Sequence, residues 1–360
     1  MMKVGIVGMP NAGKSSLFSA LTGVAAEAAN YPFTTIEPNI AVIPVEDERL
    51  KKVADTVKAS KLVPDTIGFH DIAGLVAGAH KGEGLGNQFL ANIRETDALV
   101  HVVRAHEDSS VIHPEGRVNP LADIETIETE LIFADLEQAE RRLERVAKQA
   151  KTGEHHAVAE AAWLRDVVEA LQAGQPVRTV PPPADALDAA TLLGSLTSKP
   201  VLFVANVEEG AVEVPAAVAD HAKAIGAQAV AVSARLEKEL GELDDEDAAA
   251  MREDLGLAES GLQTVVRGAF ALLDLVTFLT AGEAKPAQSW HLRRGLSAWH
   301  AAGQIHSDIQ KGFVRAEVVS WDKLVQYGGY AGARENAALR LEGRDYVIAD
   351  GDVISVKFTP

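Results

Sequence analysis

The sequence contains no cysteine and few aromatic residues, which make up 5% of its 360 residues. The absence of cysteine excludes disulfides, thiolate metal sites and a cysteine nucleophile, and it fits a reducing compartment. No run approaches the ~20 uninterrupted apolar residues of a membrane span, because the most apolar window, 269–281, carries Asp274 in its middle. The N-terminus lacks the apolar core and cleavage site of a signal peptide. We therefore expect a cytosolic protein with no membrane partner.

Positive charge is also scarce, since 34 Lys and Arg face 52 Asp and Glu, which gives a net charge of −18. So acidic a molecule is no general polyanion binder, and we expect no DNA partner. Residues 282–360 are the exception, with ten basic and nine acidic side chains. Two groups of cations are either solvated faces or local anion-binding surfaces. They are Arg293, Arg294, Lys311 and Arg315 near the C-terminus, and Arg141, Arg145, Lys148 and Lys151 at helical spacing.

Short runs rich in Val and Ile alternate with helix-length segments and polar loops. This pattern predicts an α/β fold with a mostly parallel sheet that is covered on both faces. The expected strands are residues 3–7, 40–45, 66–71, 98–103, 201–205 and 227–232.

Between the fourth and fifth of these strands, apolar residues recur at alternating steps of four and three. This period is typical of a coiled-coil seam, and it occurs twice around a turn signal at Thr152 and Gly153. The segment therefore predicts an antiparallel helical hairpin inserted into the α/β domain. The two apolar series are Ile132, Leu136, Ala139, Leu143, Val146 and Ala150, then Ala157, Ala161, Leu164, Val168 and Leu171.

The residue pattern changes again from about Thr277, where short strand-like stretches are broken by glycine. It predicts a small α+β domain at the C-terminal end of the chain. The expected domains are thus a nucleotide-binding domain at 1–120 and 196–276, the helical insertion at 121–195 and the terminal domain at 277–360.

The strongest motif is the G-x-x-x-x-G-K-S segment at residues 8–15, which directly follows a strand and precedes a helix. Its main-chain N–H groups would converge on a β-phosphate at the positive end of that helix. Lys14 would reach the β- and γ-phosphates, and the Ser15 hydroxyl would ligate Mg²⁺. The phosphate-binding set is Asn11, Ala12, Gly13, Lys14, Ser15 and Ser16.

A second motif, D-x-x-G, begins at Asp71 at the end of an expected strand. Asp71 would hold Mg²⁺, directly or through water, and the N–H of Gly74 would contact the γ-phosphate. Residues 30–39 occupy the place of a first switch loop, in which a threonine hydroxyl completes the Mg²⁺ shell when a γ-phosphate is present. We favour Thr35 for this role, with Thr34 as the alternative.

The base-binding segment departs from that of a guanine-specific GTPase, which carries Asn-Lys-x-Asp after its fifth strand. Here Asn206 is followed by Val207, Glu208 and Glu209, so the lysine is missing and the carboxylate is longer. A carboxylate placed for guanine would face the lone pair of adenine N1. The change leaves room for adenine, whose 6-amino group would donate to a backbone carbonyl or to Asn206. Ser233 and Ala234 fit the last base-contacting loop.

These motifs together resemble the YchF/Obg-like ATPase family of P-loop proteins over essentially the whole chain. Further matching segments are residues 30–39, 71–76, 82–90, 92–97 and the Asn-x-x-Glu at 206–209. The resemblance implies a central nucleotide-binding domain, a coiled-coil insertion and a C-terminal domain of the ubiquitin-like TGS type. It also implies that the protein accepts ATP in place of or beside GTP, and that it contacts the ribosome or ribosomal RNA. We expect a monomer.

The residue after Gly74 predicts slow hydrolysis. Many GTPases place a water-orienting glutamine there, whereas this chain has the apolar Leu75, as the family does. Loss of an orienting group costs ~10³ or more in rate. The resemblance makes His113 the candidate water-positioning residue, with His80 as a weaker one, and Asn11 resembles the asparagine of potassium-activated GTPases.

Two hypotheses of different class remain. The first is a nucleotide-switched ATPase whose affinity for a ribosomal partner changes when the γ-phosphate is lost. The second is a ribosome- or RNA-binding module in which nucleotide is a structural ligand and turnover is incidental. A small-molecule phosphotransferase is disfavoured, because the sequence shows no arginine-bearing lid.

Overall fold

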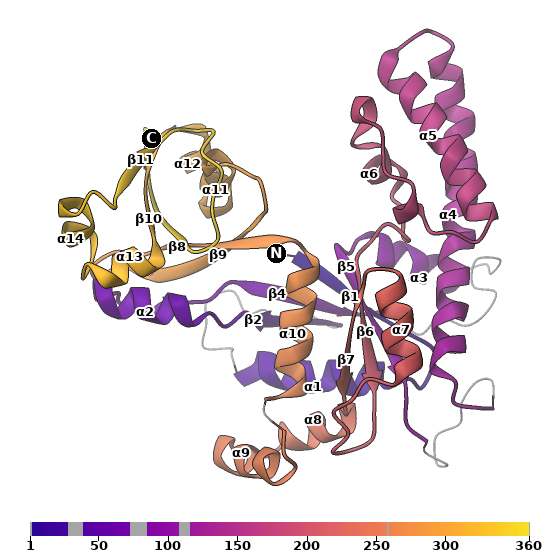
Figure 1. Ribbon diagram of the computed structural model, residues 1–360, viewed down its shortest axis with the longest axis horizontal. Helices are drawn as coiled ribbons and strands as arrows, with labels where there is room; N and C mark the ends of the chain where they lie inside the picture. The colour runs from indigo at the N-terminus through magenta and orange to yellow at the C-terminus, as the bar shows by residue number, and fades with distance from the viewer. Residues whose placement is uncertain (1, 28–38, 73–84, 108–115, 258, 360) are drawn as a thin grey trace.

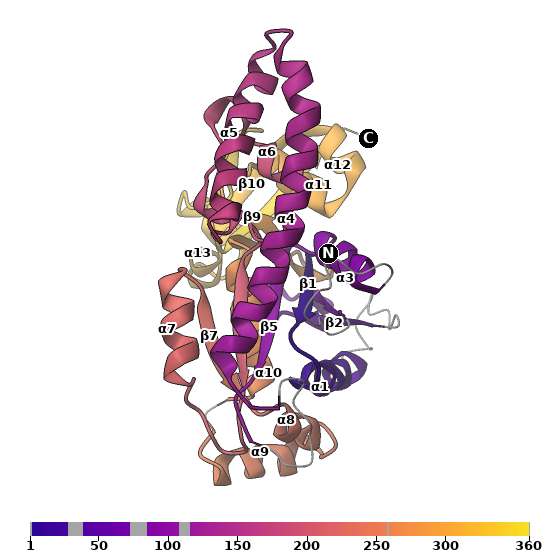
Figure 2. The ribbon, with the colours of Figure 1, turned by 90° about the vertical axis from the view of Figure 1, so that its right-hand side faces the viewer.

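The computed structural model describes residues 2–27, 39–72, 85–107, 116–257 and 259–359 of the chain (Figure 1). A sheet with helices on both faces lies at the centre, a helical hairpin rises from it, and a second sheet with short helices lies to the other side. In the view turned by 90° the hairpin stands at the top of the molecule (Figure 2). Within the described residues, no helix is both long enough and apolar enough to span a bilayer.

The first sheet has the strand order β2-β4-β1-β5-β6-β7. Only β2 runs antiparallel to its neighbour, and all other adjacent pairs are parallel. The predicted mostly parallel sheet is therefore confirmed. Its strands are β1 (Met2–Val7), β2 (Ile40–Pro44), β4 (Thr66–Asp71), β5 (Ala98–Arg104), β6 (Val201–Asn206) and β7 (Gln228–Val232).

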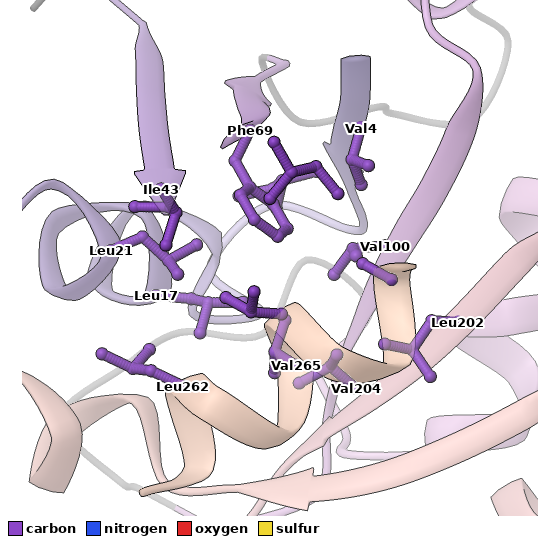
Figure 3. Close-up of a cluster of buried hydrophobic side chains, with 14 of the residues drawn as sticks. Val4, Leu17, Leu21, Ile43, Phe69, Val100, Leu202, Val204, Leu262 and Val265 are labelled. Atoms are coloured by element: carbon purple, nitrogen blue, oxygen red, sulfur yellow. The ribbon is translucent and has the colours of Figure 1, made fainter. Parts of the chain in front are cut away.

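Buried apolar side chains fix helices against both faces of this sheet. Figure 3 shows Val4, Phe69 and Val100 of the strands gathered with Leu17 of α1 and Val265 of α10. Burial of each such side chain contributes ~1.5–3 kcal/mol. Helices α3, α4 and α7 pack on the other face. The helices of this domain are α1 (Lys14–Glu27), α3 (Leu85–Arg94), α7 (Ala216–Ala224), α8 (Ala234–Leu240), α9 (Asp245–Asp254) and α10 (Gly261–Leu272).

The helical insertion is an antiparallel pair formed by α4 (Pro120–Ala150) and α5 (His155–Gln172). Asn119 begins α4, because its side chain accepts a hydrogen bond from the Ala122 N–H and Pro120 needs no donor partner. All the predicted seam residues of both helices belong to one apolar cluster. The predicted helical hairpin is therefore confirmed, and its distal end lies far from the first sheet (Figure 1).

A buried carboxylate on α4, the first helix of the insertion, binds the segment that ends the insertion. Asp135 of α4 is fully buried and accepts hydrogen bonds from the Ser195 hydroxyl at 2.9 Å and from the Thr197 N–H at 2.8 Å. This clamp fixes where the chain re-enters the sheet at β6. The return segment contains the short helices η3 (Val177–Thr179), η4 (Ala184–Ala186) and α6 (Ala189–Leu193).

The C-terminal part of the chain forms a second sheet, of order β11-β10-β12-β8-β9-β3. Its mixed strands and short helices confirm the predicted α+β character. The strands are β8 (Leu275–Thr280), β9 (Ala287–Arg293), β10 (Phe313–Ser320), β11 (Arg340–Glu342) and β12 (Asp352–Phe358), and the helices are α11 (Ala298–Ile305), α12 (Ser307–Lys311), α13 (Trp321–Gln326) and α14 (Tyr330–Glu335).

One edge of the second sheet comes from the N-terminal third of the chain. Strand β3 (Leu62–Val63) pairs in parallel with β9, and α2 (Glu48–Val57) buries its apolar face in the C-terminal core. Asp65 fixes the junction, since its carboxylate lies 2.9 Å from Nδ1 of the buried His291. Residues 48–65 thus join the first sheet to the C-terminal sheet, a connection that the sequence did not predict.

Candidate active site

The predicted phosphate loop lies at the carboxyl end of β1 and has a backbone that requires its glycines. Gly13 has φ +101°, and a Cβ placed there would lie 2.2 Å from Nδ2 of Asn206. Gly8 has φ +154°, and its Cβ would lie 2.3 Å from the Val102 carbonyl oxygen. Asn11 adopts φ +62°, in the left-handed region that asparagine tolerates. The loop is therefore shaped for close approach of the backbone to a ligand.

Lys14, the first residue of α1, is a buried cation at the floor of this loop. It is 6% exposed, and its Nζ donates a hydrogen bond to the Met9 carbonyl oxygen at 2.8 Å. Burial lowers the pKa of Lys14 from 10.5 to about 8, and the negative charge of Asp71 opposes this shift. A phosphate group would supply a further anionic partner for the buried ammonium.

The predicted Mg²⁺ ligands flank Lys14. Ser15 is exposed at the N-terminus of α1, and Asp71 ends β4, where burial raises its pKa and the Lys14 charge opposes the rise. One hydroxyl and one carboxylate suit Mg²⁺, which keeps several waters and takes further oxygens from phosphates. In the described part of the chain, no group of three or more His, Asp or Glu side chains is placed to hold a metal ion by itself. The donor set fits a nucleotide-bound Mg²⁺.

Asn206 connects the phosphate loop to the base-binding loops. This buried side chain donates from Nδ2 to the Ala12 carbonyl oxygen at 3.1 Å and accepts at Oδ1 from the Ala234 N–H at 3.0 Å. Its own carbonyl oxygen lies 2.9 Å from Nδ1 of His106. Oδ1 of Asn206 keeps a second lone pair, so both this oxygen and a backbone carbonyl stay predicted acceptors for an adenine amino group.

The predicted base-binding end of the site is more exposed than the phosphate loop. Val207 is buried and its N–H donates to the Val232 carbonyl oxygen, whereas Glu209 lies at the surface and pairs with Arg235 at 3.0 Å. Ser233 caps α8 by accepting from the Leu236 N–H.

These elements enclose a cleft of about 1160 Å³ at the carboxyl ends of the parallel strands. Every predicted nucleotide-binding residue lines it except Ala12, which is buried behind the loop. Asp71 does not line this cleft, although its charge acts on Lys14. Sequence reasoning missed several lining residues. His106 and Glu107 follow the end of β5, and this position was the available signal, whereas Arg235, Lys238 and Glu239 belong to α8 and carried no such signal.

Several predicted functional residues lie outside the described part of the chain. They include both switch threonines, Thr34 and Thr35, and the γ-phosphate contact Gly74. Leu75 and the two histidines proposed to position water, His80 and His113, also lie outside it. Their roles stay predictions.

Comparison with known proteins identifies the family. A family model described as 50S ribosome-binding GTPase matches residues 3–145, and one named YchF-GTPase_C, described as a protein of unknown function (DUF933), matches residues 275–359. The chain is 47% identical over 359 residues to the ribosome-binding ATPase YchF of Pasteurella multocida, with 99% of each chain covered. The chain belongs to the YchF family.

Two further YchF proteins show how far the likeness extends. The ribosome-binding ATPase YchF of Bacillus subtilis is 45% identical over 363 residues, with 99% of each chain covered. The structure of the Schizosaccharomyces pombe YchF GTPase superposes with a TM-score of 0.86 at 33% identity, covering 99% of this chain and 97% of that one. Together with the phosphate loop, this membership makes the chain a P-loop nucleoside triphosphatase.

Proposed function

We propose that this protein is a nucleotide-switched ATPase that hydrolyses ATP slowly, accepts GTP, and binds the ribosome in a nucleotide-dependent way. The cleft carries the proposal, because it joins a phosphate loop to a base-binding loop that lacks the guanine-specific lysine. The roles of Lys14, Ser15 and Asp71 are supported by the position of Lys14 and Ser15 at the cleft and by the charge interaction of Asp71 with Lys14. Mg²⁺ would neutralise phosphate charge there, and we expect Ser15, Asp71 and Thr35 to hold it.

Preference for ATP rests on the base end of the cleft. Glu209 replaces the shorter aspartate and is engaged by Arg235, so it is not held toward guanine. Asn206 is used to brace the phosphate loop. Neither side chain therefore enforces guanine, and the pairing of Glu209 with Arg235 reduces its repulsion of adenine N1.

Hydrolysis should be slow, because Leu75 can neither orient water nor transfer a proton. We assign water positioning to His113 and γ-phosphate contact to Gly74. Asn11 lines the cleft and supports activation by K⁺. Turnover measured in KCl and in NaCl tests this point, and equal rates would end the K⁺ proposal.

The ribosomal partner is supported by the names of the YchF relatives, which are ribosome-binding ATPases. Four exposed cations on the distal part of the hairpin offer contacts for RNA phosphates, namely Arg141, Arg145, Lys148 and Lys151. With a ribosomal partner, we expect the protein in the cytoplasm. We expect it to act as a monomer.

Co-sedimentation with ribosomes tests the switch. The protein is mixed with ribosomes in the presence of ATP, a non-hydrolysable ATP analogue, ADP or no nucleotide. The wild type should change its bound fraction with the nucleotide, whereas Lys14→Ala should bind equally in all four conditions. Lys223→Ala, which removes an exposed lysine of α7, is the matched control and should behave as the wild type.

The alternative function, a ribosome-binding module with a structural nucleotide, predicts a different result. In that case Lys14→Ala would lose nucleotide yet bind ribosomes as well as the wild type, and the wild type itself would be insensitive to nucleotide. That pair of results would reject the switch.

A further inference from the structure

A second cavity lies between the first sheet and the base of the helical hairpin, away from the nucleotide cleft. It measures about 190 Å³ and is lined by residues of β5, α4 and the return segment. Leu99, Leu131 and Leu196 form apolar walls, and none of the lining residues belongs to the predicted nucleotide site. Pockets that are mostly apolar with a few converging polar groups are typical of small-molecule sites.

His101 of β5 lines this cavity with an unsatisfied nitrogen. Its side chain is 3% exposed, and its Nε2 is fully buried without a hydrogen-bond partner among the described residues. Burial lowers the pKa of His101 to about 3, and the charges of Lys14 and His221 lower it further. The imidazole is therefore neutral at physiological pH, and its Nε2 needs a hydrogen-bond partner that a ligand could provide.

The remaining polar groups of the cavity include two partly buried cations and one carboxylate. Arg178 lies 3.5 Å from Glu128 and donates to the Thr197 carbonyl oxygen at 3.1 Å, while Glu128 also lies 3.3 Å from Nε2 of His221. Burial lowers the pKa of both Arg178 and Lys199. Glu128 is therefore shared between Arg178 and His221, and Nζ of Lys199 donates to the Arg94 and Thr96 carbonyl oxygens, so an acidic group beside Arg178 and Lys199 would be favourable.

We propose that this cavity binds a small ring compound with one acidic group, placed between α4 and the sheet. The ring would pack on the leucine walls, its acidic group would face Arg178 and Lys199, and a polar ring substituent would bond to His101. The volume fits, because a cavity of about 150 Å³ already holds benzene. The ligand would stabilise the packing of α4 on β5. The strands beside β5 lead into the loops that form the nucleotide cleft. This site does not rest on the proposed function.

Binding of 4-hydroxybenzoate to the full-length protein tests the proposal. This compound carries the ring, the acid and a hydroxyl, whereas acetate has only the acid. Ligand-observed NMR titration should show saturable binding of 4-hydroxybenzoate and at least fivefold weaker binding of acetate. In protein labelled with ¹⁵N-histidine, the Nε2 resonance of His101 should shift on binding, which locates the ligand.

Two cavity-filling variants and one control separate this site from non-specific binding. Leu131→Phe and Ile225→Phe each add atoms to a lining side chain and should each weaken binding at least tenfold, so the test survives if one of them fails to fold. Leu136→Phe alters the same helix outside the cavity and should bind as the wild type. The proposal is overturned if 4-hydroxybenzoate does not bind, if acetate binds equally well, or if folded filled variants bind like the wild type.

Discussion

The two ends of the nucleotide cleft are built differently. At the phosphate end, two glycines with positive φ, a buried lysine and the Asn206 amide are fixed by backbone geometry and burial. At the base end, Glu209 pairs with Arg235 at the surface, where both side chains are well exposed. Exposed ion pairs contribute ~0–1 kcal/mol, whereas an unsatisfied buried polar group costs ~1–3 kcal/mol.

This difference predicts that phosphate binding and base choice are separable properties of the site. A change at the phosphate end should disturb ATP and GTP alike and also the fold. A change at the base end should alter the ratio of the two affinities and leave the fold intact. The predictions below test this separation.

The largest effect is expected from Gly13→Ala. The new methyl group would collide with the Asn206 amide, and alanine at φ +101° is strained. A left-handed conformation alone costs ~1–2 kcal/mol, so with the collision we expect nucleotide affinity to fall by roughly 100-fold or more. Isothermal titration calorimetry with Mg·ATP and Mg·GTP measures the loss, which should be equal for both.

The matched control is Gly23→Ala on α1, where the added methyl meets nothing within 4 Å. It should stabilise the helix by ~0.5–1 kcal/mol without changing affinity. Unaltered binding by Gly13→Ala would contradict the assigned backbone geometry.

A smaller loss is expected from Asn206→Ala, which leaves the Ala12 carbonyl and the Ala234 N–H without their side-chain partner. Each buried unsatisfied group costs ~1–3 kcal/mol, so we expect a free energy of unfolding lower by about 2 kcal/mol and parallel losses of ATP and GTP affinity. Chemical denaturation and calorimetry measure these effects.

The control is Asn92→Ala, at an exposed position of α3. Its free energy of unfolding should stay within about 0.5 kcal/mol of the wild type. A selective loss of one nucleotide would mean that Asn206 reads the base.

The pH dependence of binding tests Lys14 alone. Its pKa of about 8 in the free protein means that the ammonium loses its proton above pH 8, whereas phosphate binds the charged form. Affinity should therefore fall as pH rises, by about tenfold between pH 7 and pH 9, with uptake of about one proton per nucleotide at pH 9. Calorimetry in two buffers of different ionisation enthalpy measures both quantities. A flat profile would show that Lys14 stays charged throughout.

The smallest effect is expected from Arg235→Ala at the base end. Loss of its exposed ion pairs with Glu209 and Glu239 should change the free energy of unfolding by less than about 1 kcal/mol. With Glu209 released, the ratio of ATP to GTP affinity should shift by only a few-fold. Competition between the two nucleotides measures the ratio, and Arg252→Ala on α9 is the control. A large drop in both affinities would refute the separation of the two ends.

Local patterns were enough to predict the first sheet, the hairpin and the phosphate loop. The P-loop motif specifies its own strand, loop and helix, and the apolar period of 132–171 specifies the helix pair. The path of residues 48–65 could not be predicted, because β3 has only two residues and its partner Ala287 lies more than 200 positions away. The brace made by Asn206 was missed for the same reason, since its contacts come from three distant loops.

The most direct test of the account is calorimetric titration of the folded wild-type protein with ATP and with GTP, each with and without Mg²⁺. We predict saturable binding of both nucleotides at one site, tighter with Mg²⁺ and tighter for ATP. Folded protein that takes up neither triphosphate in the presence of Mg²⁺ would contradict the assignment of residues 8–15 as the phosphate site.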